Sequence, residues 1–144
     1  MSTLKVDTYL TRGGASEIAI DKIKGVTAAG SMLVVGEGGT NTTNLQQGLA
    51  KAWVNFNGAS FATNDSFNVG SMTDHEAGTY TVTYSTNFGN ANNSPVTGAG
   101  GDGFTDRLLT IDSITTSTVK MIENTVDNTQ DVGIGTVHTL GDLA

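Results

Sequence analysis

The sequence predicts a mainly β protein: an antiparallel β-sandwich or jelly-roll-like domain with one short helix and an extended N-terminal arm. Two features of composition and one of pattern predict this class. Charged residues make up 15% of the chain, against about 25% in an average domain. Gly, Thr, Asn and Ser take their place, and these residues favour tight turns and pleated strands. Several short segments also alternate apolar and polar residues, as half-buried strands do.

The first part of the chain differs from the rest. Residues 1–41 contain short apolar fragments separated by glycine-rich breaks, and such fragments are too short to form a core of their own. We therefore predict that residues 1–41 form an extended anchoring arm and that residues 42–144 form the β domain. Four apolar residues of the arm are predicted to anchor it on a partner: Leu4, Val6, Ile18 and Ile20.

Residues 41–57 carry both a helix pattern and a strand pattern. The polar residues 41–44 can cap a helix, and apolar residues then recur at spacings of four, three and four at Leu45, Leu49, Ala52 and Phe56. From residue 52 onward, however, apolar residues also occupy every second position. Gly48 weakens a long helix by about 1 kcal/mol. We predict a short helix to about Ala50, followed by a strand.

The remaining elements follow from alternation and turn residues. A strand is predicted to begin at Phe67, and a polar turn at residues 74–78 joins it to a strand at residues 79–85. Residues 87–103, rich in Asn and Gly, are predicted to form a long loop. Further strands are predicted at residues 107–112, 118–122 and 132–140.

Catalytic and metal-binding groups are sparse. The chain has two histidines and no cysteine, and neither His75 nor His138 has a second His or Cys at ligand spacing. No serine lies in a Gly-x-Ser-x-Gly elbow, and no pair of carboxylates is indicated of the kind that cleaves polysaccharides. We therefore predict no metal site, no cofactor and no enzymatic activity.

The net charge and the glycine content bear on partners. A formal charge of −7 opposes binding to nucleic acid or to an anionic membrane surface. No apolar run approaches the roughly 20 residues of a membrane span, and no secretory signal opens the chain, so we predict synthesis in the cytoplasm. The 19 glycines lose much backbone entropy on folding. Partner subunits are therefore predicted to supply additional burial.

Part of the sequence resembles a known family. The motif Lys-Ala-Trp-Val-Asn-Phe-Asn-Gly at residues 51–58, with residues 45–50, 65–69 and 78–82, resembles a module of tail-fibre-like and other virion proteins of tailed bacteriophages, notably those of marine and cyanobacterial hosts. The first eight residues are also similar to the start of such proteins. Together these segments cover about a third of the chain.

The resemblance implies a non-catalytic β domain that assembles as a homotrimer. Because only some forty residues precede the module, we expect a short spike or a capsid decoration rather than a long fibre, docked by its arm on major capsid or tail proteins of the virion. The trimer contact is expected at Leu45, Leu49, Trp53 and Phe56. The alternative is a host-surface glycan-binding adhesion domain that uses residues 87–103 and exposed tyrosines.

Overall fold

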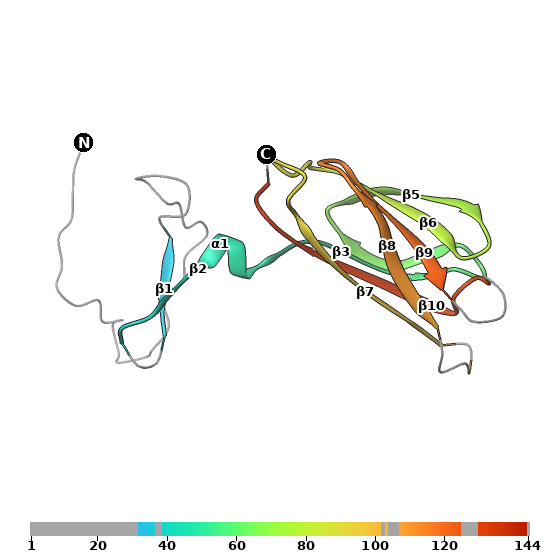
Figure 1. The fold of residues 1–144 in the computed structure, drawn as a ribbon, viewed down its shortest axis with the longest axis horizontal. Coiled ribbons are helices and arrows are strands. Elements are labelled where there is room, and N and C mark those ends of the chain that lie inside the picture. The colour runs from blue at the N-terminus through green and yellow to red at the C-terminus, as the bar shows by residue number, and fades with distance from the viewer. Residues whose placement is uncertain (1–31, 37–38, 102, 104–106, 125–129, 144) are drawn as a thin grey trace, which may run out of the picture.

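The computed structural model describes residues 32–36, 39–101, 103, 107–124 and 130–143, which form a mainly β structure (Figure 1). Two four-stranded antiparallel sheets have the strand orders β4-β3-β10-β7 and β5-β6-β9-β8. The first sheet contains β3 (Ala50–Asn57), β4 (Ala62–Phe67), β7 (Ser94–Gly100) and β10 (Ile134–Leu140). The second contains β5 (Val69–Glu76), β6 (Thr79–Tyr84), β8 (Leu108–Ile114) and β9 (Thr118–Asn124). The predicted mainly β, antiparallel fold is confirmed.

The core lies between the two sheets and follows the alternation of the sequence. Every second residue of β3 is buried, as is every second residue of β6 and β9, because successive side chains of a strand point to opposite faces. Phe56 of β3 and Tyr80 of β6 form a buried ring pair, whose ring centroids are 5.0 Å apart at 66°. This edge-to-face geometry is favoured between aromatic rings, and it joins the two sheets.

The hairpin formed by β5 and β6 confirms the two strands predicted to be joined by a polar turn. The predicted start at Phe67 was wrong, because Phe67 ends β4 and β5 begins at Val69. Met72 pairs with Val82, and the turn between the strands consists of Ala77 and Gly78. Gly78 has a φ of 72°, a conformation that costs little only for glycine. The turn is shorter than predicted, since β5 continues to Glu76 and takes up most of the polar segment at residues 74–78.

The prediction of one long loop at residues 87–103 was wrong, because β7 occupies Ser94–Gly100. The polar strand β4 was also not predicted. Both strands lie at the edges of the first sheet. An edge strand needs only one neighbour, so it tolerates Pro95, which lacks a backbone donor, and it tolerates the exposed polar residues of β4. Sequence patterns tuned to buried strands therefore missed them.

The residues expected to cap the helix form a strand instead. Strand β1 (Leu33–Val35) pairs antiparallel with β2 (Thr42–Asn44), and helix α1 (Leu45–Gly48) follows directly. The helix is thus shorter than predicted, and the boundary predicted at residues 41/42 falls inside this hairpin. The anchoring residues predicted in the arm lie outside the described residues: Leu4, Val6, Ile18 and Ile20.

The connection from β4 of the first sheet to β5 of the second sheet is a single residue, Asn68. It has a φ of 56°, a left-handed conformation that Asn tolerates better than most residues. Its side-chain amide donates to the backbone carbonyls of Lys51 (3.0 Å) and Thr86 (3.1 Å), and its side-chain oxygen accepts from the Thr86 backbone N–H at 2.7 Å. These three bonds hold the crossing point against β3 and against the segment after β6.

Candidate functional site

The outer face of the first sheet carries a row of apolar and aromatic side chains. In the strand register, Phe67 of β4 lies opposite Trp53 of β3, Trp53 lies opposite His138 of β10, and His138 lies opposite Val96 of β7. Residues directly opposite each other in antiparallel strands point to the same face. We call these four residues, Phe67, Trp53, His138 and Val96, the outer row.

The outer row is accessible in the single chain. Phe67 is 54% exposed and Val96 is 58% exposed. His138 is also exposed, and Trp53 is half-buried. The Trp53 and His138 rings stack, with centroids 6.5 Å apart and planes inclined by 20°. The row therefore presents aromatic and aliphatic surface across all four strands, which is unusual for a sheet face in contact with water.

A polar row lies beside the outer row. Asp65 lies opposite Asn55, and Asn55 lies opposite Thr136. The Asn64 side-chain amide donates to the Asn55 side-chain oxygen at 2.7 Å. These groups flank the aromatic surface on one side.

The outer face of the second sheet provides a comparison within the same molecule. There Thr73 lies opposite Thr81, and Thr81 lies opposite Lys120, which forms an exposed ion pair with Asp112 at 2.9 Å. The imidazole Nε2 of His75 lies 2.9 Å from the Thr81 hydroxyl on this face. A face dominated by hydroxyl and charged groups needs no partner to cover it.

The outer face of the second sheet also carries Ile122 and Leu108, which is 55% exposed. Leu108 lies opposite Asn124, however, and Ile122 lies opposite Thr79 and Thr110. A row of apolar and aromatic residues directly opposite one another across all four strands is found on the first sheet.

The predicted contact residues lie in different places. Leu45 is half-buried on α1, and Leu49, which directly precedes β3, is 54% exposed. Trp53 is part of the outer row. Phe56 points the other way and is 1% exposed in the core of the domain, so its side chain is not at the surface. The helical spacing that grouped these residues ends at Gly48, and strand geometry then sends residues 53 and 56 to opposite faces.

Three residues of the outer row were not predicted as site residues: Phe67, Val96 and His138. The available signal was the parity of each strand, because the residues between buried positions of β3 and β10 point outward. Parity alone does not give the register that aligns the four strands.

The tyrosines expected at a glycan site are buried. Tyr80 is 0% exposed and Tyr84 is 4% exposed. A shallow hollow does lie near the start of β7, lined by Asn90, Asn92, Ser94, Leu140, Gly141 and Asp142. The glycan-binding alternative expected exposed tyrosines. That expectation was wrong for both described tyrosines, because they belong to the core.

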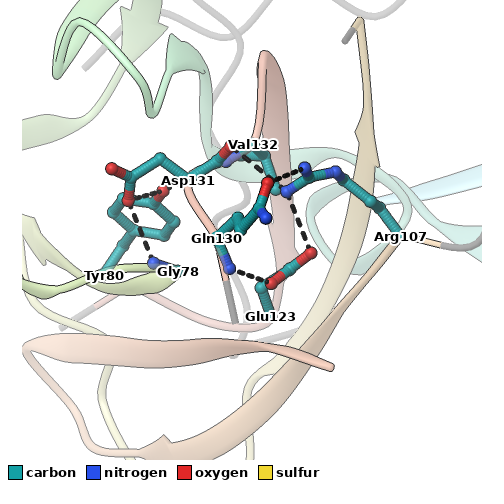
Figure 2. Close-up of polar contacts among 7 residues, drawn as sticks. All are labelled: Gly78, Tyr80, Arg107, Glu123, Gln130, Asp131 and Val132. Atoms are coloured by element: carbon teal, nitrogen blue, oxygen red, sulfur yellow. Dashed lines mark hydrogen bonds and ion pairs between the residues drawn. The ribbon is translucent and has the colours of Figure 1, made fainter. Parts of the chain in front are cut away.

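A second polar cluster lies at the end of the sandwich where β8 begins and β9 ends (Figure 2). Arg107 forms an ion pair with Glu123 at 3.1 Å, and their side chains are only 5% and 0% exposed. The same guanidinium donates to the Gln130 side-chain oxygen at 2.9 Å and to the Asp131 backbone carbonyl at 3.2 Å. The second carboxylate oxygen of Glu123 accepts from the Gln130 backbone N–H at 2.8 Å.

Tyr80 extends this network into the core. Its hydroxyl donates to the Asp131 carboxylate at 2.8 Å and accepts from the Val132 backbone N–H at 3.2 Å. The same carboxylate oxygen accepts from the Gly78 backbone N–H at 3.0 Å (Figure 2). These contacts tie the chain at residues 130–132 to the β5–β6 turn and to β9. We call the set Arg107, Glu123, Gln130, Asp131 and Tyr80 the Arg107 cluster. Its contacts hold separate segments of the fold together, which is a structural role.

The buried tyrosines predict loss of stability at alkaline pH. Burial, reinforced by the hydrogen bond to Asp131, raises the pKa of Tyr80 well above its ordinary value. Burial also raises the pKa of Tyr84. Unfolded tyrosine ionises near pH 10, so above that pH the unfolded chain loses protons that the folded chain keeps, and stability falls as pH rises. Denaturant unfolding from pH 8 to pH 11 should show a plateau below about pH 10 and a decline above it.

Tyr84→Phe is the matched control, since it removes one ionisable hydroxyl and keeps the ring against Phe88. It should make the decline shallower. Stability that stays constant to pH 11 in the parent chain would mean that these hydroxyls are not buried in solution.

In the part of the chain that the structure describes, no group of three or more His, Cys, Asp or Glu side chains is placed to hold a metal ion. No helix among the described residues is long and apolar enough to cross a membrane.

Comparison with known proteins assigns no relative to the chain, because no family model, no curated protein and no solved structure matches it.

Proposed function

We propose that this chain is a non-catalytic structural protein of a tailed-phage virion, a short trimeric spike or a capsid decoration protein docked through its N-terminal arm. The viral context and the threefold state are supported by the sequence resemblance at residues 45–58, 65–69 and 78–82. Self-association is supported by the outer row. In this proposal the protein is made in the host cytoplasm and functions in the particle, with major capsid or tail proteins as its partners.

The outer row is the observation that supports self-association best. A monomer leaves Phe67 and Val96 more than half exposed on a sheet face. Burying a fully exposed side chain of this kind stabilises an assembly by about 1.5–3 kcal/mol, so covering the exposed half of each contributes roughly half of that. Leu49, equally exposed, precedes the strand that carries Trp53 and extends this surface toward α1. A symmetric oligomer buries the same patch on every copy, so the stabilisation from each buried side chain is repeated in every subunit.

Leu49→Asp should convert the trimer to a monomer. The substitution places a charge where the proposal has an apolar contact, and a buried unpaired charge is strongly unfavourable. Analytical ultracentrifugation of the parent chain should give about three times 14.8 kDa, and the variant should give 14.8 kDa. The matched control is Phe61→Asp, which changes another exposed apolar residue, in the β3–β4 turn.

Phe61→Asp should leave the sedimentation mass unchanged. An unchanged mass for Leu49→Asp would count against the proposed contact. The viral part of the proposal has its own test: the chain should be present in purified particles of the phage that encodes it, in multiples of three copies. Its absence from such particles would refute a virion role.

Glycan binding on a host surface is the second candidate. The stacked Trp53 and His138 rings lie beside the Asn55 and Asn64 amides, and sugars bind through this combination of aromatic faces and amide hydrogen bonds. A glycan array separates the two candidates. Binding that is lost in Trp53→Ala, in a chain that stays monomeric, would favour the adhesion role.

A further inference from the structure

The β1–β2 hairpin exposes a continuous apolar strand. Leu33, Val34 and Val35 are 56%, 49% and 59% exposed. Successive residues of a strand point to opposite faces, so both faces of β1 are apolar. Apolar runs of this kind belong to strands that are covered on both faces, and an isolated two-stranded hairpin is only marginally stable in water. The hairpin therefore needs a covering surface.

The single chain does not supply that surface within its described residues. Figure 1 shows β1 and β2 beyond α1, away from the two sheets. The base of the hairpin is tied to the helix, because the Leu45 backbone N–H donates to the Met32 carbonyl at 2.8 Å. Only Leu49 separates the end of α1 from the start of β3. Because this connection is so short, the chain would have to reverse its direction at one residue for the hairpin to lie on the first sheet of the same chain.

The outer row has the size and chemistry to receive the hairpin. It crosses four strands, and three spacings of about 4.8 Å make it roughly 14 Å wide. Strand β1, with three residues, is roughly 10 Å long. Leu33 and Val35 share one face of the hairpin and would lie along the row. On the hydroxyl-rich outer face of the second sheet, the apolar residues Leu108 and Ile122 have polar residues directly opposite them and form no such row.

We propose that the hairpin of one copy packs on the outer row of the next copy. This inference rests on the proposed trimer and specifies how its subunits meet. Each copy supplies one hairpin and one row, so the contact is heterologous, and three such contacts close a ring. The occupant of the row is thus a second copy of this chain, because the described part of each chain leaves both surfaces uncovered and only Leu49 separates α1 from β3.

Disulfide trapping tests this contact directly, because the chain contains no cysteine. A Val35→Cys protein carrying a size tag is mixed with an untagged Val96→Cys protein, and the mixture is oxidised under native conditions. Both residues are exposed, so the substitutions should not disturb folding, and far-ultraviolet circular dichroism of each variant checks this. Phe67→Cys replaces Val96→Cys in a second mixture and tests the other end of the row. Thr73→Cys, on the outer face of the second sheet, is the matched control.

A mixed disulfide should form with Val96→Cys or Phe67→Cys at least tenfold faster than with Thr73→Cys. Trimers that give no mixed disulfide at either end of the row would overturn the hairpin contact and leave the trimer intact. A monomeric chain would overturn both the contact and the proposed assembly. A Val35→Cys/Val96→Cys double variant should form the bond between chains. A bond formed within one chain at high dilution would place the hairpin on its own row and refute the exchange.

Discussion

Removing either charge of the Arg107–Glu123 pair should lower the free energy of unfolding by about 3–5 kcal/mol. The two side chains are 5% and 0% exposed and lie 3.1 Å apart, so either charge left alone would be buried without its partner. Arg107→Met also removes the hydrogen bonds to Gln130 and to the Asp131 carbonyl. Since small domains are stable by about 5–15 kcal/mol, the loss is a large share of the total. Urea unfolding of each variant measures it.

Two controls separate the ion pair from general effects. In Arg107→Met/Glu123→Leu neither charge remains, so this double variant should be more stable than either single variant. Lys120→Met breaks an ion pair that is more than a third exposed on each side and should cost less than about 1 kcal/mol. If the single variants lose no more free energy of unfolding than Lys120→Met does, that result would contradict the buried position of the Arg107 cluster.

Phe56→Ala should also lower the free energy of unfolding by about 3–5 kcal/mol, because it leaves a cavity in the core. Phe56 is 1% exposed, packs against Tyr80 and fills the space over Gly135, where an added Cβ would overlap its ring. Phe56→Ala should lower the free energy of unfolding by the same amount whether it is introduced into the monomeric Leu49→Asp variant or into the parent chain. A core residue acts within each copy, whereas an interface residue acts through association.

Phe67→Ala is the matched control, since Phe67 is 54% exposed on the outer row. It should change the unfolding of the monomeric background little and weaken association of the parent chain. If Phe56→Ala instead weakened association and left the monomeric background unchanged, Phe56 would belong to the contact between copies, as the sequence pattern first suggested.

The core strands could be predicted because their burial repeats with the period of the backbone. Residues 52, 54 and 56 of β3 and residues 80, 82 and 84 of β6 are apolar and buried in alternation. The edge strands β4 and β7 escaped prediction for a physical reason. Each pairs on one side only, so polar side chains, Gly98 and Pro95 meet no penalty there.

The candidate site was predicted only in part. Trp53 and Leu49 were expected at a contact, and both are accessible in the structure. Phe67 and Val96 became candidates only when the register aligned β4, β3, β10 and β7. Two of the neighbouring pairs in this row, Trp53 with His138 and His138 with Val96, join residues more than forty positions apart in the sequence, and pairing between distant strands is not encoded in any local pattern. The Arg107 cluster likewise depends on contacts between separate strands.

The fluorescence of Trp53 tests the central claim, that the outer row is a contact between copies. Trp53 is the only tryptophan of the chain, so its emission reports on the row alone. The full chain is diluted through its association range while the sedimentation mass and the emission are recorded together. We predict that the emission moves to longer wavelength as the mass falls from about three times 14.8 kDa to 14.8 kDa. An emission that stays constant across that transition, or a mass of 14.8 kDa at every concentration, would contradict the claim.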